Sequence, residues 1–258
     1  MMNDEIILSV KNIKKWFPLR RSVTEVFKGK KRWVKAVDGV TFNIKKGEIF
    51  ALIGESGCGK TTTGRLIMKI EELTSGQIIF KGTDTSTLSS STEIKKYREE
   101  VQMVFQDPYA SMNPRFRVRD VLYEPLIIHK KTKDSREMEK IARRALEEVK
   151  LTPPEEFLDR FPHMLSGGQR QRVATARTLV LSPNLIIADE PVSMIDLSTR
   201  AEILHMMKEV QENLNLTYLY ITHDLSTARY FCDRIAVMYL GRIVELGTSD
   251  EIIENPLH

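Results

Sequence analysis

The chain has 258 residues, of which 41% are hydrophobic and 29% are charged, as in folded globular proteins. Its 39 Lys and Arg residues against 35 Asp and Glu residues leave a net charge of +4, which is too small to indicate a nucleic-acid partner. No apolar run approaches the ~18 residues of a membrane-spanning helix, and acidic residues stand where a signal peptide carries positive charge. We therefore expect a soluble, cytosolic protein that is neither secreted nor membrane-spanning.

The first part of the chain favours strands. Residues 1–47, together with the runs Ile79–Gly82 and Val101–Phe105, alternate loosely between apolar and polar residues and predict a β-rich layer. The basic segment Lys28–Lys35 is interpreted as a solvated loop, with a patch for anionic lipid or nucleic acid as the alternative. The Ser- and Thr-rich stretch Thr83–Thr92 predicts an exposed loop.

Three other segments are short, nearly continuous apolar runs, namely Glu48–Gly54, Leu185–Asp189 and Tyr218–His223. Such runs are typical of strands that are buried on both faces of a parallel sheet. We therefore predict an α/β fold whose functional site lies along the carboxyl ends of these strands. Further along, Ile235–Gly247 predicts a β-hairpin.

Residues 107–182 carry helical periodicity and little strand character, which indicates a mostly helical insertion between the first two core strands. In Arg136–Lys150, for example, the apolar residues form one stripe with charges around it. The predicted division therefore makes residues 1–106 and 183–258 a core with a β-rich part, and residues 107–182 a helical part.

The segment GESGCGKT at 54–61 matches the P-loop pattern GxxxxGK[ST] and lies between a predicted strand and a predicted helix. In this pattern, backbone N–H groups and the positive end of the helix bind phosphate oxygens. Lys60 is expected to reach the β- and γ-phosphates, and the Thr61 hydroxyl is expected to ligate Mg²⁺. The predicted nucleotide-binding residues of this segment are Gly54, Glu55, Ser56, Gly57, Cys58, Gly59, Lys60, Thr61 and Thr62.

Two carboxylates follow the second core strand. We assign Asp189, at the end of the strand, to the Mg²⁺ shell, and the adjacent Glu190 to the role of general base for an attacking water. Many core strands end in an acidic residue, so the P-loop earlier in the chain is what makes this interpretation strong.

The segment LSGGQRQR at 165–172 predicts a second helix start that is able to receive an anion. Ser166 stands at the N-cap position, Gly167 and Gly168 open a backbone concavity, and Gln169 begins the helix. From spacing alone, an ordinary capped helix with a basic face is an equally good interpretation.

Together these motifs resemble, in order and over essentially the whole chain, the ATP-binding subunit of an ABC transporter, whose signature LSGGQ stands unchanged at 165–169. The resemblance implies a P-loop NTPase core of the RecA-like kind with an antiparallel β layer and a helical insertion. It implies ATP and Mg²⁺ as cofactors. It also implies a head-to-tail dimer with a second ATPase subunit, identical or homologous, in which the signature residues of one subunit cover the ATP of the other.

The resemblance also implies roles for single residues. Gln106 resembles the Q-loop glutamine that contacts Mg²⁺ and the attacking water, and His223 resembles the switch histidine, so both join Glu190 and Lys60 as predicted catalytic residues. The segment SMID at 193–196 resembles the D-loop, and Asp196 matches its aspartate at the dimer interface. Phe17 resembles the aromatic residue that stacks on adenine, with Trp16 as the alternative.

A narrower resemblance, to the dipeptide, oligopeptide and nickel importer branch, rests on QDPYASMNP at 106–114 and FPHMLSGGQRQR at 161–172. It implies an ATPase subunit on the cytoplasmic face of the membrane that powers uptake, of peptides in the first place, through separate permease subunits. An extracytoplasmic solute-binding protein would be an indirect partner. The alternatives are a non-transport ABC ATPase acting in DNA repair or translation and, from another class, a regulatory GTP switch, for which no guanine-selecting segment is present.

Overall fold

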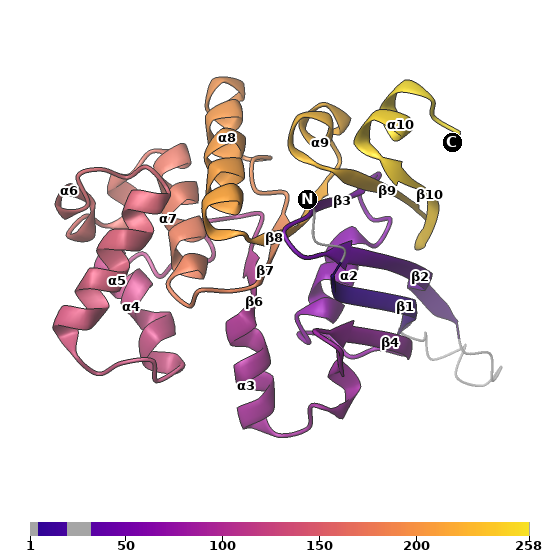
Figure 1. Cartoon of the computed structure of the whole chain (residues 1–258), viewed down its shortest axis with the longest axis horizontal. Coiled ribbons are helices and arrows are strands. Elements are labelled where there is room, and N and C mark those ends of the chain that lie inside the picture. The colour runs from indigo at the N-terminus through magenta and orange to yellow at the C-terminus, as the bar shows by residue number, and fades with distance from the viewer. Residues whose placement is uncertain (1–4, 20–31, 258) are drawn as a thin grey trace.

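The computed structural model describes residues 5–19 and 32–257, which form two sheets and the helices around them (Figure 1). The larger sheet has six strands in the order β10-β9-β3-β8-β7-β6, and the smaller one has four strands in the order β2-β1-β4-β5. The strands are β1 Ile6–Pro18, β2 Trp33–Lys45, β3 Ile49–Ile53, β4 Ser75–Phe80, β5 Thr83–Asp84, β6 Val101–Val104, β7 Leu185–Asp189, β8 Thr217–Thr222, β9 Arg234–Tyr239 and β10 Arg242–Thr248.

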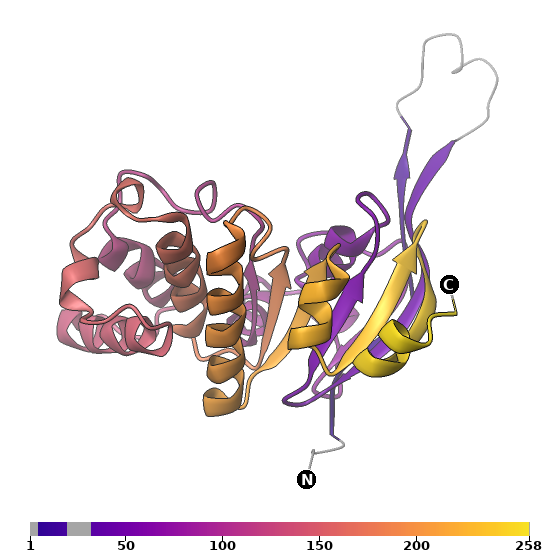
Figure 2. The same cartoon turned by 90° about the horizontal axis from the view of Figure 1, so that it is seen from above.

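The helices gather mainly on one side of the large sheet and beyond its β6 edge (Figures 1 and 2). The α-helices are α2 Lys60–Ile67, α3 Ser91–Glu100, α4 Val118–Ile128, α5 Ser135–Glu148, α6 Glu155–Leu158, α7 Gly167–Leu179, α8 Leu197–Leu214, α9 Leu225–Phe231 and α10 Ser249–Glu254. Two short 3₁₀ turns are η1 Thr85–Thr87 and η2 Pro162–Met164. No helix within residues 5–19 and 32–257 is long and apolar enough to cross a membrane.

The large sheet is buried on both faces, which explains the continuous apolar runs of its strands. In β3, Ile49, Ala51 and Ile53 pack with the helices, whereas Phe50 and Leu52 pack toward the small sheet and α2. All neighbouring pairs in this sheet are parallel except β9 and β10, which form the predicted hairpin. The α/β prediction is therefore confirmed.

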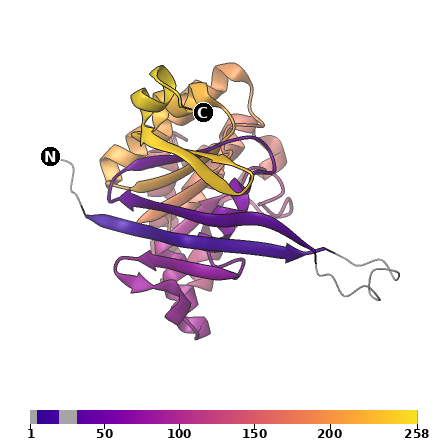
Figure 3. The same cartoon turned by 90° about the vertical axis from the view of Figure 1, so that its right-hand side faces the viewer.

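The small sheet is antiparallel and lies beside the large one, with the long strands β1 and β2 crossing the molecule next to each other (Figure 3). Phe42 of β2 stacks on Phe50 of β3, with ring centroids 5.0 Å apart, and so joins the two sheets. Of the basic segment Lys28–Lys35, residues 28–31 lie outside the described residues, and Trp33 begins β2.

Two expectations for this half of the chain are wrong. The run Val101–Phe105 does not belong to the β-rich layer, because β6 pairs in parallel with β7 at the edge of the large sheet. Its side chains face both cores, as those of a buried parallel strand do. The stretch Thr83–Thr92 is not one loop: it holds β5 and η1, and Ser90 caps the start of α3 in a capping box with Glu93.

The topology brings the functional segments to one edge. Because β3, β8 and β7 are parallel neighbours, their carboxyl ends lie side by side, with Ile53 opposite Thr222 and Asp189 opposite Ile221. The P-loop, His223 and Glu190 follow directly from these ends. The helices α4–α7 lie between β6 and β7 in the chain. Gln106 follows the carboxyl end of β6 at this edge, and Gly167 of the signature lines a small pocket together with it.

Candidate functional site

The P-loop joins β3 to α2 and curls around the amine of Lys60. The Lys60 Nζ donates hydrogen bonds to the carbonyl oxygens of Gly54 and Glu55, at 2.6 and 2.9 Å. Gly59 precedes the helix at φ +110°, and a Cβ there would lie 2.1 Å from the carbonyl oxygen of Ala36. Only glycine fits both the backbone conformation and the close approach of β2. The turn leads directly into the N-terminus of α2, which is the kind of helix end that binds phosphate.

The side chain of Cys58 turns inward from the same loop. It is only 4% exposed, and its Sγ lies 3.8 Å from the Lys60 Nζ. The Cys58 carbonyl accepts a hydrogen bond from the Gly241 amide, at 2.9 Å, which ties the loop to the β9–β10 hairpin. Cys58 therefore faces the protein, and its contribution to phosphate binding is restricted to the backbone.

Thr61 and Asp189 form the oxygen pair that was predicted for Mg²⁺. The Thr61 hydroxyl donates to Asp189 Oδ1 across 3.1 Å. Burial raises the pKa of the Asp189 carboxyl above its ordinary value, and the neighbouring Glu190 charge adds to the shift. The described residues hold no group of three or more His, Cys, Asp or Glu side chains for a metal. A hydroxyl and one carboxylate fit Mg²⁺, which takes one or two protein oxygens and completes its shell with water and substrate phosphates.

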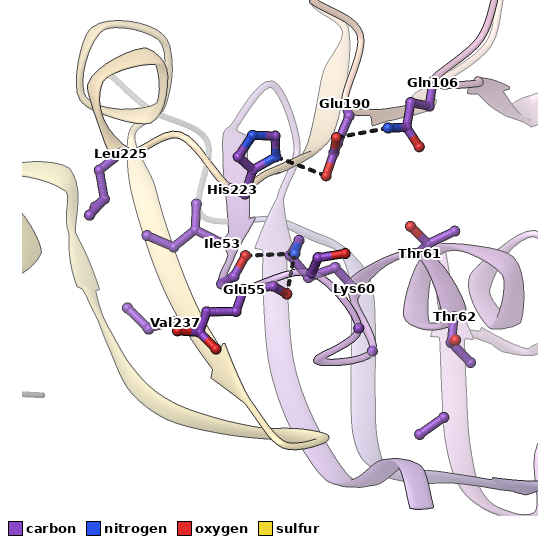
Figure 4. A pocket seen from close by; sticks show the side chains of 15 residues that line it. Ile53, Glu55, Lys60, Thr61, Thr62, Gln106, Glu190, His223, Leu225 and Val237 are labelled. Atoms are coloured by element: carbon purple, nitrogen blue, oxygen red, sulfur yellow. Dashed lines mark hydrogen bonds and ion pairs between the residues drawn. The ribbon is translucent and has the colours of Figure 1, made fainter. Parts of the chain in front are cut away.

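Glu190, Gln106 and His223 are joined at the mouth of the loop, although they come from three segments (Figure 4). Glu190 Oε2 accepts a hydrogen bond of 3.0 Å from Gln106 Nε2. Glu190 Oε1 lies 3.0 Å from His223 Nδ1. Glu190 has a φ of +47°, a left-handed conformation that is costly for a non-glycine residue and that occurs at functional sites. Both carboxylate oxygens are thus held over the cleft.

These groups line one cleft of about 790 Å³. Most of the predicted P-loop residues line it, with Gln106, Glu190 and His223. It also has four apolar lining residues that the sequence analysis missed: Ala36, Ile53, Leu225 and Val237. No local motif marks them, because they come from β2, β3, α9 and β9 and meet only in the fold. They supply an apolar wall on which a flat base or ribose is able to pack.

The aromatic candidates Trp16 and Phe17 do not line the cleft. The Trp16 Nε1 donates to Asp38 Oδ1, at 3.1 Å, and its ring lies under the Lys35 amine, 4.6 Å from the centroid. Phe17 is 36% exposed at the end of β1. The Phe17 ring also has a cation beside it, the Lys15 amine 5.0 Å from its centroid, so both rings have a charged neighbour. Phe17 is the more exposed of the two and has no hydrogen-bonding atom to be held by, so it is the better candidate for stacking on a bound base.

The signature residues also lie outside the cleft of their own chain. Ser166 is the N-cap of α7, and it forms a capping box with Gln169, whose side chain reaches back to the Ser166 amide at 3.0 Å. Ser166 is exposed, whereas Gly168 is buried against α8. Asp196, at the start of α8, is exposed as well. One chain therefore has a phosphate cleft and a separate, solvent-facing helix start.

A P-loop after β3, and a paired Asp and Glu at the carboxyl end of β7, two strands away in the same parallel sheet, define a P-loop NTPase. A family model described as "ABC transporter" matches residues 37–193, and this chain belongs to that family. The oligopeptide transport ATP-binding protein AppF of Bacillus subtilis (strain 168) is 49% identical over 99% of this chain and 76% of its own length. The dipeptide transport ATP-binding protein DppF of Escherichia coli (strain K12) is 44% identical over 98% of this chain and 73% of its own length.

Solved structures agree with this assignment. The protein cbiO1 from Clostridium perfringens, described as part of the ABC transporter complex cbiONQ, has a TM-score of 0.81 at 29% identity and covers 97% of this chain and 92% of its own. A dimeric ATP-binding cassette, MJ0796, bound to ADP and Pi, has a TM-score of 0.79 at 29% identity and covers 94% of this chain and 98% of its own. The predicted ABC ATPase architecture is confirmed.

Proposed function

We propose that this chain is the ATP-hydrolysing subunit of an ABC importer for peptides. The observation that carries the ATPase assignment is the Gln106–Glu190–His223 group held above the P-loop. The peptide assignment rests on relatives such as AppF and DppF, whose names describe oligopeptide and dipeptide transport. The chain then acts on the cytoplasmic face of the membrane, bound to separate permease subunits and supplied indirectly by an extracytoplasmic solute-binding protein.

In the proposed reaction, the triphosphate of ATP lies along the P-loop with its adenine toward Phe17 and the apolar wall of the cleft. The backbone N–H groups of the loop bind the phosphate oxygens, and Lys60 exchanges its two carbonyl partners for the β- and γ-phosphates. Thr61 and Asp189, with Gln106 nearby, would hold Mg²⁺, which when bound would supply positive charge to the phosphates.

Glu190 is the group that moves the proton. A water placed between Glu190 and the γ-phosphate gives its proton to the carboxylate as its oxygen bonds to phosphorus, and the bond to the ADP oxygen breaks. Gln106 and His223 each hold one oxygen of Glu190 in place, so the carboxylate meets the water in a set orientation.

The exposed signature suggests how the site is completed. A helix N-terminus with two glycines and a serine binds anions well, yet in its own chain it faces solvent. In a head-to-tail dimer with an identical or homologous ATPase subunit, Ser166, Gly167, Gly168 and Gln169 cover the γ-phosphate that the other subunit binds. Asp196 contacts the other subunit next to them.

The importer assignment is tested by measuring the uptake of a labelled tripeptide by cells that carry this chain. Deleting the chain is expected to abolish uptake, wild type restores it, and Glu190→Gln does not, because the coupled hydrolysis is lost. A matched measurement of Ni²⁺ uptake distinguishes a peptide importer from a nickel importer. Normal tripeptide uptake after deletion, or ATP turnover by the purified chain that only nucleic acid stimulates, contradicts the importer assignment and favours a non-transport ABC ATPase.

If the site is shared between two subunits, Ser166→Arg is expected to impair dimerisation without impairing the binding of ATP. A long cation at the exposed N-cap is expected to block ATP-dependent dimerisation while binding of ATP to a single subunit stays within about threefold of wild type, because Ser166 lies outside its own cleft. Sedimentation of the hydrolysis-deficient form with ATP measures the dimer, and a fluorescent nucleotide measures binding.

Substitution of Ser166 also removes an N-cap, which costs about 1 kcal/mol in stability by itself. The Tm of Ser166→Arg without nucleotide measures this loss of stability apart from dimerisation. An ATP-induced dimer of unchanged stability in Ser166→Arg contradicts the two-subunit site.

A further inference from the structure

The first turn of α8 contacts two segments that the proposed function places against the partner subunit. Thr199 lies in this turn, and its hydroxyl donates a hydrogen bond of 2.7 Å to Asp196 Oδ2 of the D-loop. Its methyl group points the other way, toward the start of α7. A Cβ built on Gly168 would lie 2.5 Å from the Thr199 Cγ2, and the next nearest atom is the Thr199 Cβ at 3.9 Å. The methyl group alone therefore fills the space where a side chain at 168 would stand.

The methyl and the hydroxyl of Thr199 are bonded to the same carbon, so they cannot move independently. Threonine is restricted at χ1, and a rotation that withdraws the methyl from position 168 also carries the hydroxyl away from Asp196. A displacement at the signature is thus transmitted to the D-loop by one torsion angle.

The next residue fixes the rest of the D-loop to the same helix. Arg200 Nε donates to the Ile195 carbonyl at 2.8 Å, and its Nη2 donates to the Ser193 carbonyl at 3.2 Å. These bonds hold the backbone before Asp196, while Thr199 holds its side chain. The turn Asp196–Arg200 therefore contacts both the D-loop and the start of the signature helix α7.

We propose that Thr199 is a positioning residue that couples the signature to the D-loop, so that the contact of the signature with the ATP of the other subunit and the contact of Asp196 with that subunit are set together. The inference rests on the proposed two-subunit site. Glycine at 168 serves this coupling: it admits the Thr199 methyl, which in turn keeps the hydroxyl on Asp196. Thr199 does not touch the nucleotide, and it acts through Gly168 and Asp196.

The test is a suppressor experiment with four forms of the full chain: wild type, Gly168→Ala, Thr199→Ser and the double variant. Gly168→Ala is expected to lower kcat for ATP hydrolysis about tenfold or more, with the Kd of the single subunit for ATP nearly unchanged. Thr199→Ser keeps the hydroxyl and removes the methyl, so the double variant is expected to recover to within about threefold of Thr199→Ser alone. A double variant that is as slow as Gly168→Ala overturns the proposal, because the obstruction is then the approach of the nucleotide and not Thr199.

The hydroxyl is tested with Thr199→Val, which keeps the branched shape. Its kcat is expected to fall as far as that of Asp196→Ala, and the combined variant is expected to fall no further. Multiplicative losses in the combined variant contradict the coupling.

Thermal unfolding of the first four forms separates this inference from the proposed function. The added methyl in Gly168→Ala is expected to lower Tm and Thr199→Ser to restore it, whether or not ATP is hydrolysed. A wild-type chain that hydrolyses no ATP overturns the proposed function, while the pattern of Tm values still tests the contact between Gly168 and Thr199. An unchanged Tm in Gly168→Ala would count against the contact.

Discussion

Glu190→Gln is expected to lower the rate of ATP hydrolysis at least ~10²-fold while ATP binding is retained, since a positioned general base contributes about 10²–10⁴-fold. Glutamine has the shape of glutamate but no basic carboxylate. Its amide is able to accept from Gln106 and to donate to His223 Nδ1, so both 3.0 Å contacts survive while the proton acceptor is lost. Single-turnover hydrolysis and equilibrium binding of a fluorescent nucleotide give the two quantities separately.

The same variant predicts an accumulated dimer. Because ATP is bound and not consumed, the two-subunit complex is expected to persist in Glu190→Gln and to be resolved by gel filtration with ATP. Glu212→Gln removes an exposed carboxylate far along α8 and serves as the control with the same chemical change. An ATP turnover in Glu190→Gln within a few-fold of wild type would contradict the assignment of Glu190 as the general base.

The second large effect is expected for Lys60→Ala. Lys60 is 5% exposed, and its amine makes two hydrogen bonds to carbonyl oxygens of the loop that it closes. Its removal takes away the charge that binds the β- and γ-phosphates and leaves the Gly54 and Glu55 carbonyls facing each other. We expect ATP affinity to fall about tenfold or more, at ~1.5–3 kcal/mol for hydrogen bonds to a charged group, and turnover to be abolished.

Lys140→Ala, an exposed lysine of α5, is the matched control for the loss of one positive charge. The Tm of both variants without nucleotide shows whether the loop still folds. An ATPase rate in Lys60→Ala equal to that of the control is incompatible with a phosphate-binding P-loop.

The core strands were predictable from sequence because their signal is local. A strand that is buried on both faces is apolar at every position, and β3, β7 and β8 meet that rule with very few exceptions. In β6, Gln102 interrupts the apolar run, and four residues are too few to separate a core strand from one in the β layer. Its pairing with β7 depends on residues more than eighty positions away.

The other two differences have separate causes. The start of α3 has a Ser90–Glu93 capping box, a signal that was present in the Ser- and Thr-rich stretch but was outweighed by its composition. The apolar wall of the cleft has no signal at all, because each of its members is an ordinary strand or helix residue until the sheet closes.

The sequence by itself determined which chemistry this protein performs. The P-loop, the carboxylates after β7 and the signature are motifs in which neighbouring residues act together, so a linear pattern records them. Only the tertiary structure decided how they are combined. Gln106 and His223 both hold Glu190, and Trp16 is occupied on its own sheet. The signature lies outside the cleft of its own chain, and Thr199 stands between Gly168 and Asp196. Each of these depends on distances between residues far apart in the chain or between faces of helices, and such distances exist only once the sheets and helices have packed.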